Sequence, residues 1–447
     1  MKQLITDSAT KLYRTLVAGV EKKIPLANGR MVPAINFDNA ATTPPFISVL
    51  EAINEFAPWY SSIHRGAGYK SKYSTRTYEI AREIVASFVG ADLNHDVVIF
   101  VKNTTEAINK LSCRLQDEIG KNGVVLTTYM EHHSNDLPWR MRYRVDYVNV
   151  DEKGRLCLED LKAKLQKYGG AIKLVAVAGA SNVTGYVNPI HEIAEIAHHY
   201  GAKIAVDGAQ LVPHMPIAME PISSSRHIDF LAFSAHKMYA PFGIGVLIGP
   251  RTVFEKGEPE FPGGGTVDIV TPDYVQWSPP PKKEESGTPN LMGVVALTAA
   301  IKTIQSLGME KIHQHELKLT RYAIEQLLEI PDVQLYCNVE DFTHRVGIIP
   351  FNIDGLHHAL VAEALSLEAG IAVRSGCFCA QPYIQKLLKI PSEEVKKRIS
   401  GDEALHPGVV RVSFGLYNQK EEVDVLISSI KKIAANKKEY KNKYRFI

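Results

Sequence analysis

SAHKMYAPFG, residues 234–243, joins two apolar runs, IDFLAF before it and IGVLI after it. Both runs predict buried strands, so Lys237 is expected in a tight turn between two strands of the interior. A lysine is almost never buried unless its amine is used, and a desolvated amine has a lowered pKa that suits Schiff-base chemistry. A lysine in a surface loop is the alternative. Ser234 and His236 favour the first interpretation, because they can hold an anion beside the amine.

A second stretch, KIAVDGAQ at 203–210, ends an apolar run in the carboxylate of Asp207. The strand that it predicts would bring Asp207 to the carboxyl end of a sheet, where open α/β sheets bind their ligands. Such an aspartate can simply cap the following helix. It can also be the anionic partner of a pyridinium nitrogen, and together with Lys237 it would form the protein's half of pyridoxal phosphate (PLP) chemistry.

Asp207 followed by the motif Ser234-x-His236-Lys237 resembles the class V aminotransferase branch of the fold-type I PLP enzymes. Within that branch, the sequence is similar to the group that contains the SufS-type cysteine desulfurases and the selenocysteine lyases. The resemblance extends from Asn36 to about Leu426, and several separate motifs fall in the order found in that family.

The resemblance implies an α/β fold of PLP fold-type I, with a mainly parallel seven-stranded sheet in a large domain and a smaller α/β C-terminal domain. Strands that alternate with helical patterns from about 97 to 250 also favour a largely parallel sheet covered on both faces. The expected divisions are an N-terminal segment packing with the small domain (1–34), the large PLP-binding domain (35–290) and the small domain with the catalytic cysteine loop (291–447).

The cofactor phosphate is expected where a helix begins, after the apolar run at 97–101. Thr104 and Thr105 at this point can be helix caps, but the free amides and positive dipole end of a helix also bind phosphate. The resemblance implies that Thr105 holds the phosphate together with Ser234 and His236, and that Thr104 is a cofactor-binding residue.

Three further side chains are assigned through the resemblance. His132 would stack on the pyridine ring and move protons, Asn182 would contact the substrate and the ring oxygen, and Gln210 would bind the cofactor. His132 is followed by a second histidine. Because two neighbours in sequence cannot readily chelate one ion, no metal site is predicted.

The stretch GIAVRSGCFCAQP at 370–382 contains the candidate thiol. Cys379 matches the persulfide-forming cysteine of the SufS-like family, and the variant CFC also resembles the corresponding segment of molybdenum-cofactor sulfurases. If this loop is extended, Cys377 and Cys379 point the same way and either sulfur can face the cofactor. Arg374 nearby would lower the pKa of a thiol. The alternative is that both cysteines are buried apolar fillers.

Arginines and two N-terminal motifs complete the expected substrate site. A planar guanidinium suits capture of an amino acid's carboxylate, and the resemblance assigns this role to Arg374 and Arg411. DNAATT at 38–43 resembles a motif that lies beside the substrate site in the family. HRG at 64–66 resembles a family loop, but the residues after it differ, which leaves the role of the loop 64–77 open.

Composition favours a globular enzyme acting on a small molecule. The chain has 447 residues and a formal net charge of +2, which gives no basic field for nucleic acid. No apolar run approaches the roughly 18 residues of a membrane span, so a cytoplasmic location without membrane contact is expected. The five cysteines are odd in number and form no CxxC pair, which predicts reduced thiols.

The predicted function is that of a PLP-dependent cysteine desulfurase, which converts L-cysteine to L-alanine and keeps the sulfur as a persulfide on Cys379. The expected assembly is a homodimer in which Thr288, in the motif GTPN, reaches the cofactor phosphate of the other subunit. Alternatives are a selenocysteine lyase, a C–S lyase, aminotransferase or epimerase that does not use Cys379, and a sulfur-relay subunit that hands persulfide to an acceptor protein.

Overall fold

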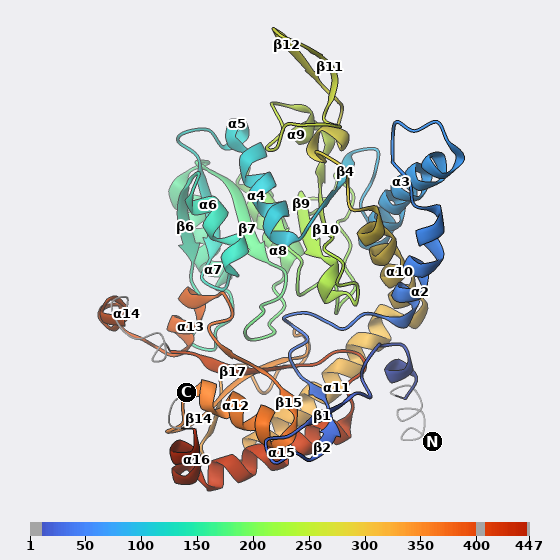
Figure 1. Ribbon diagram of the computed structural model, residues 1–447. Helices are drawn as coiled ribbons and strands as arrows, with labels where there is room; N and C mark the ends of the chain where they lie inside the picture. The colour runs from blue at the N-terminus through green and yellow to red at the C-terminus, as the bar shows by residue number, and fades with distance from the viewer. Residues whose placement is uncertain (1–10, 399–406, 445–447) are drawn as a thin grey trace.

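The computed structural model describes residues 11–398 and 407–444. Figure 1 shows two bodies, an upper one built on a large sheet and a lower one that contains most of the C-terminal third of the chain. Residues 1–10 of the predicted N-terminal segment, and 399–406 and 445–447 of the predicted small domain, lie outside the described residues.

A seven-stranded sheet forms the centre of the upper body within the described residues, with the strand order β4-β10-β9-β8-β7-β5-β6. Strand β10 runs antiparallel to both of its neighbours, while the pairs β9–β8, β8–β7, β7–β5 and β5–β6 are parallel. The predicted mainly parallel sheet is therefore confirmed. Its strands are β4 (Asp96–Val101), β5 (Val124–Thr128), β6 (Arg144–Val148), β7 (Ile172–Ala178), β8 (Lys203–Asp207), β9 (Phe230–Ser234) and β10 (Gly245–Pro250).

Helices cover both faces of this sheet, because successive side chains of each strand point to opposite sides and both sets are apolar. On one face, α4 (Thr104–Arg114) packs on β9 and β10 and shares a core with Leu247 and Ala232. On the other face, α3 (Tyr69–Val89), α8 (Ile190–His199) and α10 (Leu291–Leu307) form the larger core with Val246 and Phe233.

The lower body has its own core and, among the described residues, a four-stranded sheet in the order β13-β14-β17-β16. Its strands are β13 (Val333–Leu335), β14 (Ile348–Ile353), β16 (Arg374–Gly376) and β17 (Val409–Ser413). Helices α11 (Met309–Leu328), α12 (His358–Ala369) and α15 (Lys420–Ala435) supply the apolar side chains that cover this sheet.

The remaining elements are short and connect or extend the two bodies. They are β1 (Lys23–Pro25), β2 (Met31–Pro33), β3 (Ile35–Asn36), α2 (Ile47–Phe56), η1 (Ala57–Trp59), α5 (Gln116–Ile119), η2 (His133–Asn135), α6 (Leu137–Arg140), α7 (Leu158–Tyr168), η3 (Ala235–Lys237), α9 (Arg251–Glu255), β11 (Val267–Thr271), β12 (Tyr274–Trp277), η4 (Lys282–Glu284), β15 (Ile371–Ala372), α13 (Gln381–Leu387), α14 (Ser392–Arg398) and α16 (Lys437–Lys443).

The packing of α10 indicates where the boundary between the large and the small domain lies. This helix contacts α2 and α3 and contributes Val294, Leu297 and Ile301 to the core of the upper body. After a bend of 78°, the first turn of α11 still contributes Met309 and Ile312 to that core, and the later turns of α11 pack in the lower body. We therefore propose a division near Gly308 instead of the predicted one before Leu291.

Within residues 11–398 and 407–444, no single helix has both the length and the apolarity of a membrane span. The bent pair of α10 and α11 has them only when the two helices are taken together.

The N-terminal segment is joined to the lower body ahead of β3. The backbone N–H of Ala27 donates to the carbonyl of Leu367 in α12, at 2.9 Å.

Candidate active site

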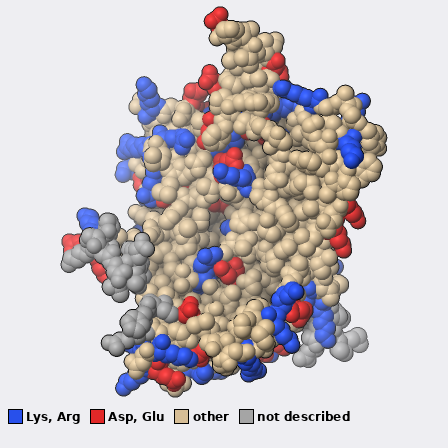
Figure 2. Space-filling view, in the orientation of Figure 1, with Lys and Arg blue, Asp and Glu red and all other residues tan. Residues whose placement is uncertain are grey.

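A cavity of about 440 Å³ lies at the carboxyl ends of β8 and β9 and is closed from below by β16 and β17. Figure 2 shows this face of the molecule hollowed between the two bodies, with charged atoms of both signs at the hollow. Twelve of the predicted site residues line the cavity: Thr104, Thr105, His132, Asn182, Asp207, Gln210, Ser234, His236, Lys237, Arg374, Cys379 and Arg411.

The start of α4 forms one wall. Asn103 caps this helix, since its side-chain oxygen accepts the backbone N–H of Glu106 at 3.0 Å. The threonines are therefore not needed as caps: the Thr104 hydroxyl lies 2.7 Å from that of Ser234, and Thr105 lies 2.7 Å from Ser134. Hydroxyls and a positive helix end that meet in one cavity suit a bound phosphate.

Lys237 ends the 3-10 turn η3 between β9 and β10, as the sequence predicts. It is partly buried, and it lines the cavity. Burial lowers the pKa of Lys237 to about 8, although the charges of Asp207 and Cys379 act in the opposite direction. An amine with such a pKa is partly neutral near pH 7 and can act as a nucleophile or a base.

Asp207 ends β8 and is 6% exposed. One carboxylate oxygen accepts the backbone N–H of Ala209 at 3.0 Å. Burial raises the pKa of Asp207, against the opposing effects of that hydrogen bond and of Lys237. A cation placed against the carboxylate would offset the cost of burying its charge.

The position of the ring proton of His132 follows from its contacts. Its Nδ1 accepts the backbone N–H of Ser134 at 3.1 Å, so the neutral ring carries its hydrogen on Nε2. Burial, with Lys237 as the next cause, lowers the pKa of His132 to about 3. The ring is therefore neutral at pH 7 and fit to stack on another aromatic ring.

Arg411 in β17 is buried and donates to two partners, the carbonyl of Asn182 at 2.9 Å and Asp38 at 3.0 Å. The Nε of Arg374 lies 3.2 Å from the other oxygen of Asp38. Burial lowers the pKa of Arg411 to about 10, although Asp38 opposes the change. Asp38 thus holds both predicted carboxylate-binding arginines. The resemblance places the DNAATT motif, which begins with Asp38, beside the substrate, but the sequence does not indicate this ion pair.

The cysteine loop is not extended. Phe378 and Cys379 have φ angles of 52° and 54°, so the condition under which both cysteines would point the same way is not met. Cys379 is exposed and lines the cavity. The Sγ of Cys377 instead donates to the carbonyl of Pro407 at 3.0 Å, and burial raises its pKa. Arg374, expected from the sequence to lie near the thiol, forms an ion pair with Asp38.

Two hydrogen bonds dock this loop on the upper body. The side-chain amide of Asn182 donates to the carbonyl of Phe378 at 2.8 Å, and the backbone N–H of His133 donates to the carbonyl of Cys379 at 2.6 Å. The Phe378 ring also covers the guanidinium of Arg411, at 4.7 Å from the ring centroid. Contacts from three separate elements hold the backbone at these positive φ angles.

Comparisons with known proteins agree with this geometry. The family model "Aminotransferase class-V" matches residues 35–426. The chain belongs to the class V aminotransferase family. A relative from Haloferax volcanii, named cysteine desulfurase, is 36% identical over 89% of this chain and 89% of its own length. A probable cysteine desulfurase from Pyrococcus abyssi is 36% identical over 93% of this chain and 96% of its own length.

Solved structures give the same result for the fold of this class V protein. The apo structure of a cysteine desulfurase from Thermococcus onnurineus has a TM-score of 0.80 and 34% identity, and covers 93% of this chain and 97% of its own. The cysteine desulfurase CsdA from Escherichia coli has a TM-score of 0.79 and 27% identity, and covers 95% and 98%. The predicted α/β fold of PLP fold-type I and the predicted family are therefore confirmed.

The cavity of this class V protein fits a PLP-like group in one further respect. Gln210 donates its side-chain amide to the carbonyl of Ala40 at 2.7 Å, while its buried Oε1 has no hydrogen-bond partner among the described residues. A buried carbonyl oxygen without a donor is costly, so a ligand hydroxyl at this point would be favourable.

Ser134 also lines the cavity, where its hydroxyl contacts that of Thr105. It was not identified from the sequence, because this contact exists only in the folded chain.

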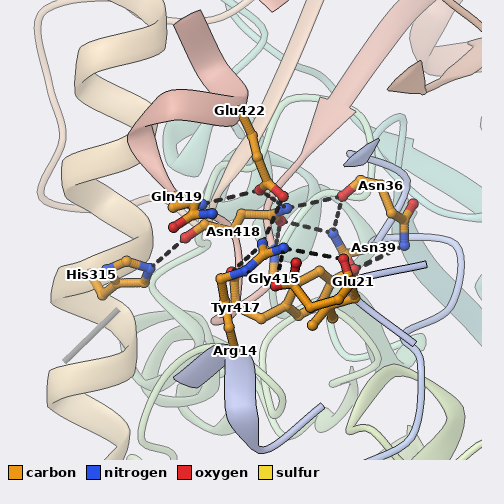
Figure 3. A network of polar contacts seen from close by, with 11 residues as sticks. Arg14, Glu21, Asn36, Asn39, His315, Gly415, Tyr417, Asn418, Gln419 and Glu422 are labelled. Carbon is orange, nitrogen blue, oxygen red and sulfur yellow. Dashed lines mark hydrogen bonds and ion pairs between the residues drawn. The ribbon is translucent and has the colours of Figure 1, made fainter. Parts of the chain in front are cut away.

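A polar network below the cavity fixes the DNAATT segment (Figure 3). The side chain of Asn39 donates to Asn418 at 3.1 Å, and Asn418 donates to Glu422 at 2.9 Å. Glu422 in turn forms an ion pair with Arg14 at 2.7 Å. The network joins the segment that carries Asp38 to the lower body, and so positions that carboxylate against the arginines.

Two sequence motifs lie outside the cavity. Thr288 is exposed and does not line it. In the loop 64–77, His64 lies 3.0 Å from Glu79, and Arg65 donates to the carbonyl of Val267 in the β11–β12 hairpin at 3.4 Å. Within the described subunit, neither segment contacts the cavity.

Proposed function

We propose that this protein is a PLP-dependent cysteine desulfurase that converts L-cysteine to L-alanine and holds the sulfur as a persulfide on Cys379. The observation that carries the proposal is that an exposed thiol and a desolvated lysine line one cavity together with Asp207 and two arginines. A cytoplasmic location, expected from the sequence, belongs to the same proposal.

The residues present suit the cofactor. Asp207 would oppose the pyridine nitrogen, Gln210 and Asn182 would meet the ring oxygen, and His132 would stack on the ring. Its phosphate would lie against Thr104, Thr105, Ser234 and His236, and burial lowers the pKa of His236 to about 4, so this imidazole is neutral at pH 7. When bound, PLP supplies an aldehyde for the amines and an electron sink for the negative charge on the substrate carbon.

Substrate binding would begin at the arginines. Asp38 occupies Arg374 and Arg411 in the described state, at 3.2 Å and 3.0 Å. The carboxylate of the amino acid would share or replace these contacts, because a guanidinium binds a carboxylate through two parallel hydrogen bonds. Lys237 would then take the α-proton, because Nε2 of the neutral His132 already carries a hydrogen and its Nδ1 accepts the backbone N–H of Ser134.

Cys379 would perform the sulfur transfer. Its thiolate attacks the sulfur of the substrate, so that an S–S bond forms between the two sulfurs while the carbon–sulfur bond of the substrate breaks. The electron pair of the broken bond stays with carbon, which takes up a proton and gives alanine. Because Cys379 is exposed, the persulfide would be open to a sulfur-acceptor protein.

The direct test is product analysis of the purified protein with L-cysteine. We expect equal amounts of alanine and reducible sulfur, with protein-bound persulfide before a reductant is added. L-Selenocysteine and L-cystine serve as comparison substrates. A selenocysteine lyase would act on selenocysteine and leave cysteine intact, and a C–S lyase would release pyruvate instead of alanine; either result would contradict the proposal.

We also propose a homodimer in which Thr288 binds the cofactor phosphate of the other subunit. The exposed position of Thr288 supports this, and so do nearby exposed aromatic side chains, Trp59, Tyr60 and Tyr69. Tyr60 lines a surface pocket together with Pro289 and Asn290, the two residues that follow Thr288 in the sequence. The hairpin β11–β12, which projects from the upper body in Figure 1, exposes further apolar residues, Ile269, Val270 and Tyr274. Such clustered apolar surface is typical of protein interfaces.

Thr288→Ala is expected to weaken PLP binding roughly 10- to 100-fold, because a hydrogen bond to a charged group contributes about 1.5–3 kcal/mol. The measurement is PLP titration of the apoenzyme, with sedimentation at micromolar concentration to establish the assembly. Ser286→Ala, an exposed hydroxyl two residues away, is the control and should bind PLP normally. A monomer with full affinity for PLP would contradict the proposal.

A further inference from the structure

Two histidines and an aspartate lie together at the opposite end of the sheet from the cavity. His198 belongs to the last turn of α8, and His227 and Asp229 lie directly before β9. Because β9 is a five-residue strand, Asp229 lies about 13 Å or more from the cavity end of that strand. The cluster is therefore separate from the proposed catalytic site.

Each of the three side chains offers one ligand atom to the cluster. Nε2 of His198 lies 2.8 Å from one oxygen of Asp229, and Nε2 of His227 lies 3.4 Å from the other. The two imidazole rings are stacked, with centroids 4.3 Å apart and an angle of 21° between their planes. All three ligand atoms lie within 4.8 Å of one another.

The other ring nitrogens fix the tautomers. Nδ1 of His198 lies 2.7 Å from the carbonyl oxygen of Ser225, and Nδ1 of His227 lies 2.6 Å from that of Ser224. A carbonyl oxygen only accepts, so each Nδ1 must carry the hydrogen. In the neutral rings, both Nε2 lone pairs then face the carboxylate of Asp229, which has no hydrogen to donate when it is ionised. One carboxylate oxygen also accepts the backbone N–H of Ile204 at 2.8 Å. The two Nε2 atoms are the ring atoms that remain available to a cation.

A proton on either ring pairs that ring with Asp229, and Lys203 lies 3.8 Å from the same carboxylate. A single divalent ion would replace these protons and bind both rings and the carboxylate together.

We propose that His198, His227 and Asp229 bind one divalent transition-metal ion. Imidazole nitrogens with one carboxylate are the ligands that Zn²⁺ and Co²⁺ accept, and metal-bound histidines commonly donate their other N–H to a backbone carbonyl, as both do here. His198 also lies at the negative end of the α8 dipole, which favours a cation. Three protein ligands leave a fourth position for water.

Rotation of a ring would complete the site. The stacked rings direct their in-plane Nε2 lone pairs nearly in parallel, so one imidazole would have to turn for both to reach one ion. Ligand atoms about 2.0–2.1 Å from a tetrahedral Zn²⁺ lie roughly 3.3 Å apart, so the 2.8 Å contact between His198 and Asp229 would open by a few tenths of an ångström. The charged neighbours are Lys203, which would turn away from Asp229, and Asp96, whose carboxyl interacts with His227. The ion would join the end of α8 to the start of β9.

Equilibrium dialysis of the holoenzyme against Zn²⁺ tests the proposal. We expect His198→Ala and His227→Gln to bind one equivalent fewer than the wild type, while turnover of L-cysteine stays unchanged because the catalytic cavity is distant. His199→Ala, which removes the exposed next residue of the same helix, is the matched control and should bind as the wild type does. Zinc held by Cys379 is common to all four proteins and cancels in the comparison.

A second measurement protects against misfolded variants. Zn²⁺ is expected to raise the melting temperature of the wild type and of His199→Ala, and to raise it less in the two ligand variants, because an ion that binds only the folded state stabilises it. With Co²⁺, visible absorption typical of bound imidazole should be present in the wild type and absent in both ligand variants. Equal zinc binding by the wild type and the ligand variants would overturn the proposal.

Discussion

Cys379→Ala is expected to abolish the formation of alanine from L-cysteine, with a loss of at least about 10³-fold, because the variant lacks the nucleophile that takes the sulfur. The protein-bound persulfide should disappear with it. PLP binding should remain, since none of the described contacts of the phosphate site or of Asp207 involves this side chain. Alanine release, persulfide labelling and the cofactor spectrum are the three measurements.

Cys377→Ala is the matched control, two residues away in the same loop. Its Sγ donates to the carbonyl of Pro407 outside the cavity, so this variant is expected to lower turnover only modestly and to keep the persulfide. With L-selenocysteine, Cys379→Ala should lose less activity, because selenium leaves carbon more easily than sulfur does. Full cysteine-dependent activity in Cys379→Ala would rule out the desulfurase mechanism and favour the lyase or aminotransferase alternatives.

Lys237→Ala is expected to lose the covalent attachment of PLP and, with it, turnover by roughly 10³-fold or more. The physical reason is the position of this amine, which lines the cavity between β9 and β10 with its pKa lowered to about 8 by burial. Borohydride reduction of the wild type should fix PLP on the peptide that contains Lys237, and the variant should show no fixed cofactor. Peptide mapping by mass spectrometry makes the measurement.

The variant Lys237→Arg distinguishes the effect of the positive charge at this position from the covalent attachment of PLP. It keeps a cation beside Asp207 but offers no amine that can form the covalent link, so PLP should bind without being fixed by borohydride. If reduction labels another lysine in the wild type, the assignment of Lys237 is wrong, and the proposed roles of the residues around it fail as well.

Much of the large sheet could be predicted because its strands are continuous apolar runs, which is how strands buried on both faces read in sequence. The turns after those runs placed Asp207 and Lys237 at one edge of the sheet. The α10 helix was harder to assign, since an apolar helix after a proline- and glycine-rich segment fits either body. Only its contacts with α2 and α3 place it in the upper one.

The geometry of the cysteine loop could not be predicted, since left-handed backbone at Phe378 and Cys379 is unfavourable in isolation. It depends on partners that are about 200 residues away in sequence, such as Asn182. The pairing of Asp38 with Arg374 and Arg411 is of the same kind, because it joins the N-terminal segment to β16 and β17. Local patterns carry no information on such contacts.

The amine and the thiol are held by parts of the molecule that differ in how readily they open. Lys237 follows β9, an interior strand whose amides are protected on both sides by β8 and β10, so this region should exchange its backbone hydrogens only on global unfolding. The loop of Cys379 lies where the two bodies meet and is docked by two hydrogen bonds and one ring, next to the fully buried Ala380. The amides around Cys379 are therefore expected to exchange their hydrogens sooner than those of β9, so the thiol depends on local contacts where the amine depends on the whole sheet.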